Sequence, residues 1–131
     1  MANYSSNELK EIYRIAKLYY EMGYIVPAEK LFWGIVSVRD DFFEAHLGLG
    51  VIYLEKGQVD DAAKHFRRAM TTEQFAVEAK IGLALSFIAT SSLARAQALL
   101  AQMAYENLKS NVLTDKQKST VAGLLELCLA A

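Results

Sequence analysis

The sequence repeats itself at intervals of about 34 residues, and this period restricts the possible folds more than any other feature of the chain. The matches fall at spaced positions, where large residues recur as large and small ones as small. The recurring sets are Tyr19/Tyr53/Phe87, Ala28/Ala62/Ala96, Phe32/Phe66/Leu100 and Ile15-Ala16/Leu49-Gly50/Leu83-Ala84. Spaced matches of this kind indicate that the repeating property is side-chain packing. We therefore expect three stacked units, at about residues 9–42, 43–76 and 77–110.

Each unit has the pattern of a helical hairpin. Apolar residues recur at three- and four-residue spacing before and after a turn marked by Gly23, Gly57 or Ser91. Glycine at this position suits the left-handed conformation that ends a helix. The pattern predicts helices near 7–22, 26–39, 43–56, 59–71, 76–90 and 93–107, and a lone seventh near 115–130. Three capping boxes are predicted at helix starts: Ser5 with Glu8, Asp41 with Glu44, and Thr114 with Gln117.

These elements predict an all-α fold without a sheet, in which small residues allow two helices to cross closely. The side chains that we expect to be largely buried are Ala16, Tyr19, Ala28, Phe32, Gly50, Tyr53, Ala62, Phe66, Ala84, Phe87 and Ala96. An uncapped stack of repeats exposes its last interface, so the seventh helix should cover the third unit. Its apolar contacts are expected from Leu124, Leu125 and Leu127, with Val121 and Cys128 beside them.

Composition excludes several classes of function. The 131 residues suffice for one domain, and a net charge of −1 without a basic cluster argues against nucleic acid as a partner. Cys128 is the single cysteine and there are only two histidines, so we expect no disulfide, no metal site and no cofactor. The N-terminus lacks the pattern of a signal peptide, and no apolar run is long enough for a membrane span. We expect a cytoplasmic protein that does not insert into membranes.

The second unit carries the pattern of a known repeat family. Leu49-Gly50, Tyr53, Gly57, Ala62, Phe66 and Ala69 stand where the tetratricopeptide-repeat (TPR) family has its packing residues, and the resemblance covers about residues 9–110. The chain departs from the family at His46, where tryptophan is usual, and it lacks the proline that often ends a unit. The resemblance implies helix pairs stacked into a right-handed superhelix with a concave groove.

A narrower resemblance comes from the organisation of the whole chain. Three repeats after a short N-terminal segment, followed by one closing helix, are similar to the class II chaperones of bacterial type III secretion. The string Leu47-Gly48-Leu49-Gly50 in the second repeat is also similar to that group. This resemblance implies a cytoplasmic protein that holds a translocator protein before export.

In the TPR fold the first helix of each pair lines the groove, which allows candidate binding residues to be chosen from the alignment of the repeats. Once core positions are removed, three rows remain: Tyr13/Leu47/Ile81, Lys17/Val51/Leu85 and Tyr20/Leu54/Ile88. Glu44, Glu55 and Glu78 are placed toward the rim. The helix over 43–56 is apolar around most of its circumference, which indicates burial on two faces. We predict that an extended or helical apolar segment of another protein binds along these rows.

Two other occupants of this surface remain open at the sequence level. The closing helix could fold back over it, or a second copy of the chain could cover it in a homodimer. Trp33 lies beside the core residue Phe32 and is either partly buried core or a site of self-association. The rows cannot bind an acidic C-terminus as some TPR domains do, because Tyr13, Leu47 and Ile81 stand at positions where those domains have polar residues that bind a carboxylate.

The leading functional hypothesis is a non-catalytic binding module, namely a chaperone or adaptor for another protein. The alternative is a structural subunit held permanently in a multi-protein assembly. An enzyme is disfavoured, because no phosphate-binding loop, activated nucleophile or paired carboxylates can be placed in a common pocket.

Overall fold

The structure is a computed structural model that describes residues 3–130 and contains seven helices and no strand within them. The predicted all-α fold is confirmed. The helices are α1 (Ser6–Glu21), α2 (Ile25–Val38), α3 (Phe43–Glu55), α4 (Val59–Ala69), α5 (Glu73–Ala89), α6 (Leu93–Ser110) and α7 (Asp115–Ala130).

Most helix boundaries lie close to those predicted, and the largest differences have local causes. α5 begins at Glu73, three residues earlier than predicted, because Thr72 is already extended and leaves the following residues free to be helical. α6 continues to Ser110 and stops where Asn111 adopts the left-handed conformation with φ of 49°.

Two of the three predicted capping boxes are present. At α1 the Glu8 backbone N–H donates to Ser5 at 3.1 Å and the Ser5 N–H donates to Glu8 at 3.0 Å. Thr114 and Gln117 make the same pair of bonds at 2.9 and 3.1 Å before α7. The predicted box between Asp41 and Glu44 is wrong, because α3 begins at Phe43 and places Phe42, which has no accepting side chain, at the N-cap.

The turns within the three helix pairs share one backbone conformation. Gly23, Gly57 and Ser91 have φ of 87°, 78° and 60°, so all three lie in the left-handed region. The alignment of the repeats places these residues in register. Ser91 shows that the third turn keeps the conformation even though it has a side chain, at some energetic cost.

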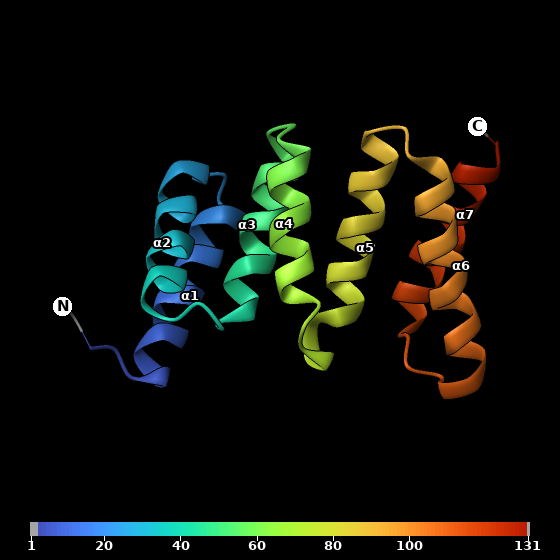
Figure 1. The fold of residues 1–131 in the computed structure, drawn as a ribbon. Coiled ribbons are helices and arrows are strands. Elements are labelled where there is room, and N and C mark those ends of the chain that lie inside the picture. Colours follow the sequence, from blue (N-terminus) through green and yellow to red (C-terminus); the bar gives the residue numbers. More distant parts are fainter. Residues whose placement is uncertain (1–2, 131) are drawn as a thin grey trace.

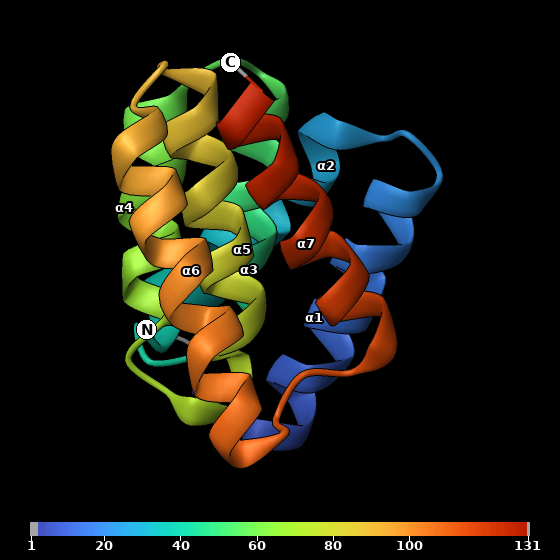
Figure 2. The same ribbon diagram turned by 90° about the vertical axis from the view of Figure 1, so that its right-hand side faces the viewer.

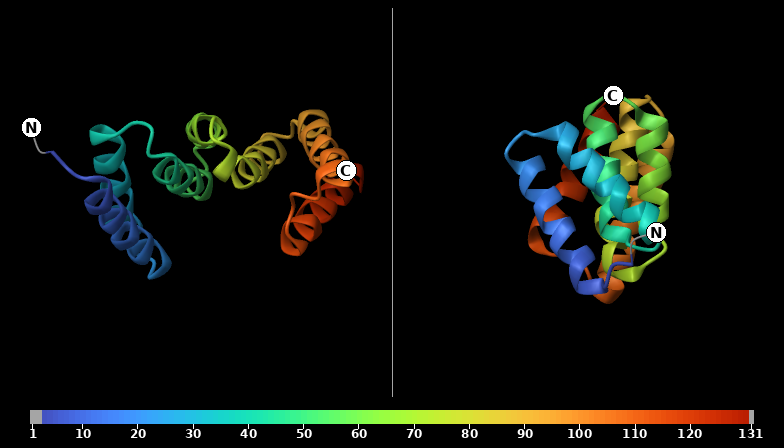
Figure 3. Two further views of the ribbon diagram at one scale, coloured as in Figure 1. Left: turned by 90° about the horizontal axis from the view of Figure 1, so that it is seen from below. Right: turned by 90° about the vertical axis from the view of Figure 1, so that its left-hand side faces the viewer.

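The helices stand side by side in chain order, from α1 and α2 at one end to α6 and α7 at the other (Figure 1). Viewed from below, they follow an arc, with α2, α4 and α6 along its outer side and α1, α3, α5 and α7 along its inner side (Figure 3, left). The view along the row shows α7 on the same side as α1 (Figure 2). The inner surface of this arc is where a ligand groove is expected.

Aromatic rings packed against glycine backbones hold neighbouring helix pairs together. Phe66 of α4 is 1% exposed and lies between Gly50 of α3 and Gly82 of α5. A Cβ atom at Gly82 would be 2.4 Å from the Phe66 ring, and one at Gly50 would be 2.7 Å from it. These positions therefore need glycine because of close packing, and their helical backbone requires no special conformation.

The predicted core is confirmed at most positions and is wrong at Tyr19. Ala16, Ala28, Phe32, Gly50, Ala62, Phe66, Ala84 and Ala96 are buried, and Tyr53 and Phe87 are half-buried. Tyr19 is 37% exposed and packs only at its edge against Tyr24. Its counterpart Tyr53 packs against Trp33 of the preceding helix pair. α1 is the first helix of the described residues, so Tyr19 has no such neighbour among them.

The seventh helix packs on the third pair, as the predicted cap requires. Val121 and Cys128 of α7 are buried in one cluster with Leu100 and Met103 of α6, and Leu124 and Leu125 pack against this cluster. The expected contact from Leu127 is wrong, since it is 53% exposed. Residues 121, 124, 125 and 128 share one helical face by their spacing, and residue 127 lies off that face.

Candidate functional site

An apolar groove with a volume of about 540 Å³ runs across the inner surface of α1, α3 and α5. Eight of the nine predicted binding residues line it: Tyr13, Lys17, Tyr20, Leu47, Val51, Leu54, Ile81 and Leu85. The alignment of the repeats predicted that these residues share one surface, because equivalent residues of stacked helices face the same way. The structure thus places the predicted rows on one surface, while their role in binding remains a prediction.

Ile88 is the one predicted row member that does not line this groove. Its side chain packs instead against the cluster that contains Val121 and Cys128 of α7. Ile81 packs against the same cluster and also lines the groove, so this end of the groove adjoins the core of the third helix pair and α7. The middle row stays open, with Val51 and Leu85 each 37% exposed.

The floor of the groove is formed by two phenylalanine rings from the outer helices. Phe32 and Phe66 both line the groove although they are only 3% and 1% exposed. Each ring lies against a glycine of an inner helix: a Cβ atom at Gly48 would be 2.7 Å from Phe32, and one at Gly82 would be 2.4 Å from Phe66. The two ring and glycine pairs occupy equivalent positions of successive repeats. The sequence contained both glycines, but only the packing of the rings explains them.

Hydrogen bonds fix both edges of the groove. At the C-terminal ends of α1 and α3 the Tyr20 hydroxyl donates to the Glu55 carboxylate. At the other edge the Gln117 side-chain amide of α7 donates to Glu78 of α5 at 2.7 Å. Burial, with a contribution from Glu55, raises the pKa of Tyr20 to about 12, so this hydroxyl keeps its proton at neutral pH.

An aromatic cluster joins α2, α3 and α4, and we define it as Trp33, His46, Tyr53 and His65. The Trp33 indole N–H donates to the Tyr53 hydroxyl at 2.8 Å, and Tyr53 donates to Glu29 at 3.1 Å. The ring of His65 stacks on Tyr53 with centroids 5.6 Å apart. Although Trp33 is 43% exposed, its polar atom has a partner within the chain.

The two histidines, which the sequence separates by nineteen positions, meet through their Nδ1 atoms at 3.0 Å. The carbonyl of Asp40 can only accept a hydrogen bond, so Nε2 of His46 at 2.9 Å must donate to it. In the neutral pair Nδ1 of His46 then accepts from Nδ1 of His65. Burial, and next the charge of His46, lower the pKa of His65 to about 4. Sequence spacing alone gave no sign of this contact.

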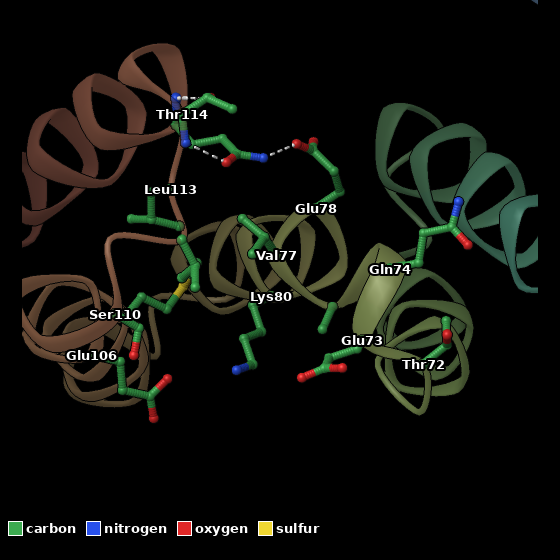
Figure 4. Close-up of a pocket in the computed structure, with 14 residues that line it drawn as sticks. Thr72, Glu73, Gln74, Val77, Glu78, Lys80, Glu106, Ser110, Leu113 and Thr114 are labelled. Atoms are coloured by element: carbon green, nitrogen blue, oxygen red, sulfur yellow. Dashed lines mark hydrogen bonds between the residues drawn. The ribbon is translucent and has the colours of Figure 1, made fainter.

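A second recess, with a volume of about 960 Å³, lies at the opposite side of α5 and is bounded by α6 and the segment that leads into α7. Figure 4 shows the polar side chains of Glu73, Lys80 and Glu106 below Val77 and Leu113 in this view, and all five residues line the recess. The bond from Gln117 to Glu78 lies between this recess and the groove. We prefer the smaller groove as the candidate site because its lining is mostly apolar, which suits an apolar ligand better than the mixed lining of the larger recess.

The described residues offer little support for other kinds of site. Among residues 3–130 no group of three or more His, Cys, Asp or Glu side chains could hold a metal ion. None of the helices in this part of the chain is long and apolar enough to cross a membrane.

The paired helices and the inner groove define a solenoid of helical hairpins, the architecture of TPR proteins. No protein-family model matches the sequence, and no curated protein matches it. The structure is similar to two crystal structures of the type III secretion chaperone SycD from Yersinia enterocolitica, with TM-scores of 0.83 and 0.84. In each case 22% of residues are identical, over 96% of this chain and 95% of SycD.

The two SycD structures differ in what they contain. One is a complex with a peptide of the translocator YopD, and the other is an alternative dimer. The similarity extends over nearly the whole length of both chains and confirms the predicted TPR-like helical fold. At this level of identity it is the fold that is shared.

Proposed function

We propose that this protein is a non-catalytic, cytoplasmic chaperone that holds an apolar segment of a partner protein in the groove of α1, α3 and α5. Its most specific form is a class II chaperone of type III secretion. The observation that carries the proposal is the open middle row, where Val51 and Leu85 stay exposed beside a core that is already filled. Contiguous exposed apolar surface in a folded protein typically marks an interaction site. The fold shared with SycD, which was crystallised with a translocator peptide, supports the same function.

The two ring and glycine pairs in the groove floor indicate how such a segment would lie. Phe32 lies against Gly48 of α3 and Phe66 lies against Gly82 of α5, so the pairs stand on neighbouring inner helices. Packed helices are about 8–10 Å apart. A segment in the extended polyproline II conformation advances about 3.1 Å per residue with three residues per turn, so side chains three positions apart point the same way and match this distance. The proposal therefore expects two apolar anchors at positions i and i+3 of an extended segment.

The groove is tested by placing a charge in its middle. The tagged chain is used to isolate its partner from extracts of its own cells, and the identified partner is then purified for affinity measurements. Leu47→Glu and Leu85→Glu should each weaken binding at least about a hundredfold, because an unpaired carboxylate would be buried against an apolar ligand. Leu127→Glu, at an exposed position of α7, is the matched control and should bind normally.

The result against this proposal would be native affinity in both groove variants. The outer surface around Trp33 would then be the better candidate. A melting temperature near that of the parent in each variant shows that the fold is intact and that a loss of affinity belongs to the groove.

The structural-subunit alternative makes a different prediction for the free chain. A permanent subunit should be insoluble or unfolded unless its partner is co-expressed, whereas a chaperone must fold alone before it captures its client. Expression of the chain by itself, followed by a thermal melt, distinguishes the two. The filled core and the α7 cap favour the chaperone.

A second copy of the chain is a further partner that the exposed surface favours. The outer face of α1 carries an apolar stripe that is 37–59% exposed, formed by Ile15, Leu18, Tyr19 and Met22. Trp33, the residue predicted from the sequence for self-association, is bonded within the chain and is the weaker candidate. Sedimentation equilibrium should show a homodimer that Leu18→Glu dissociates and Trp33→Phe leaves intact. The opposite pattern would restore Trp33 as the contact.

A further inference from the structure

Carboxylates border the apolar groove on both sides, at positions that follow the repeat. Glu44 of α3 and Glu78 of α5 are equivalent residues of successive repeats on one edge, near the N-terminal ends of their helices. Glu21 of α1 and Glu55 of α3, a second equivalent pair, lie at the C-terminal edge. The apolar rows lie between these two edges, and both Glu55 and Glu78 line the groove itself.

None of these carboxylates forms an ion pair within the described part of the chain. Glu55 accepts a hydrogen bond from the hydroxyl of Tyr20 and Glu78 accepts one from the amide of Gln117, and both donors are neutral. The ion pairs formed among residues 3–130 all use other acidic residues. Both glutamates therefore lie at the edges of an apolar surface without a cationic partner in an ion pair.

The field of these carboxylates reaches the groove. The pKa of Tyr13 is raised to about 12, first by burial and then by the negative charges of Glu44 and Glu21, which lie on opposite edges. Two lysines lie close to these carboxylates: Lys17 of α1 lines the groove with Glu55 and Glu78, and Lys116 of α7 lines a small adjoining recess with Glu78. Neither lysine forms an ion pair with Glu55 or Glu78.

We infer that the segment held in the groove carries Lys or Arg residues beside its apolar anchors, placed over α3 and α5 next to Glu55 and Glu78. This inference rests on the proposed function and specifies the chemistry of its ligand. A neutral segment that closed over the groove would take these carboxylates out of water without a partner, which is unfavourable. A basic side chain supplies the missing charge and can reach the edge while its aliphatic part lies on the apolar floor.

The inference is tested with a library of random peptides displayed on phage and selected on the immobilised full-length chain. We expect the retained peptides to combine apolar residues with Lys or Arg. The selection is repeated on Glu55→Gln/Glu78→Gln, in which the amide oxygens can still accept the bonds from Tyr20 and Gln117. The matched control is Asp60→Asn/Asp61→Asn, which removes the same charge from an exposed turn of α4 away from the groove.

The most enriched peptide is then synthesised and its affinity is measured by fluorescence anisotropy. Loss of two partly exposed ion pairs should weaken its binding to the Glu55→Gln/Glu78→Gln variant about tenfold and leave the α4 control unchanged. Raising NaCl from about 50 mM to about 500 mM should weaken binding to the parent and have a smaller effect on the groove variant.

The outcomes separate this inference from the function on which it rests. If the parent selects apolar peptides without basic residues, and Leu47→Glu abolishes their binding, the groove function stands and the inference is overturned. Equal affinity for the parent and the Glu55→Gln/Glu78→Gln variant would also overturn it. If the parent retains no peptide, or Leu47→Glu retains the same ones, the proposed groove function and the inference fall together.

Discussion

The inner and outer faces of the central helix pair, α3 and α4, both expose large side chains, but for different reasons. On the outer face Tyr53 is bonded to Trp33 of the neighbouring helix α2 and stacks on His65. On the inner face Val51 and Leu54 line the open groove. An exposed aromatic residue that completes a network within the chain needs no ligand to explain it. The open aliphatic row does, and the comparison therefore directs attention to the groove.

The largest expected effect on the free energy of unfolding comes from replacing Phe66, which lies in the core beneath both faces. Phe66 supports the groove floor and fills the core between α3 and α5. Phe66→Ala should lower the free energy of unfolding by about 3–5 kcal/mol, because it leaves a cavity where packing is tight on both sides. Urea unfolding measures this loss. Leu129→Ala, at an exposed position of α7, serves as the control, and a loss below about 1 kcal/mol for Phe66→Ala would contradict the packing described.

The next effect tests the close helix crossing beneath both faces. Ala62 is fully buried, and a larger side chain there must push the two helices of the pair apart. Ala62→Leu should lower the free energy of unfolding by about 1–3 kcal/mol. Ala98→Leu, on an exposed position of α6, should change it little. An unchanged thermal melt for Ala62→Leu would show that the crossing is loose.

The third effect belongs to the outer face alone and depends on pH. The folded pKa of His65, about 4, lies below its ordinary value of 6.5, so folding favours the neutral ring. The stability that this ring contributes is fully present above pH 6.5 and is lost as the pH falls toward 4. At about pH 5 the loss should be about 1 kcal/mol, after allowing for the solvent screening of a half-buried ring.

The pH effect is measured as the difference in melting temperature between about pH 7.5 and about pH 5 for the parent and for His65→Gln. The parent should lose more stability on acidification than the variant does. The acidic residues titrate in both proteins and cancel in the comparison. If the melting temperatures of the two proteins changed equally with pH, the contact between the two histidines would not restrict the protonation of His65.

The smallest expected change in stability is the one that best distinguishes the inner face from the outer face. Leu85→Glu places a charge on the open inner face, where its carboxylate can remain hydrated in the free protein. We expect the free energy of unfolding to change by less than about 0.5 kcal/mol. A large destabilisation of the free chain would show that the row belongs to the core, and the distinction between the two faces would disappear.

The repeat made the inner surface predictable. A constant repeat length places equivalent side chains on the same side of stacked helices, so the rows could be chosen by alignment before any contact was known. The same regularity is a weaker guide at the two ends. Tyr19 was expected to be buried because Tyr53 and Phe87 are its counterparts, but its environment depends on a neighbour that the described first repeat does not have. Ile88 was assigned to the groove by alignment, but it does not line the groove and packs against the buried cluster shared by α5, α6 and α7.

Contacts between residues outside the repeat pattern could not be predicted. His46 and His65 belong to the two helices of one pair, and their meeting depends on the crossing geometry of α3 and α4. Gly48 and Gly82 could be noted as unusual, but their role follows from the positions of Phe32 and Phe66 on other helices. The recess in Figure 4 likewise depends on where the segment before α7 lies.

Gln117 couples the state of the groove to the dynamics of the last helix. Its carbonyl oxygen accepts the Thr114 N–H that caps α7, while its amide nitrogen donates to Glu78 at the groove edge. A ligand that takes over Glu78 removes the bond that orients this side chain, and the first turn of α7 becomes easier to open. We therefore expect amide hydrogen exchange over 114–118 to speed up when the groove is filled, even as the inner helices become better protected. The rate of hydrogen exchange in the first turn of α7 would then indicate whether the groove is occupied, although the ligand need not touch that turn.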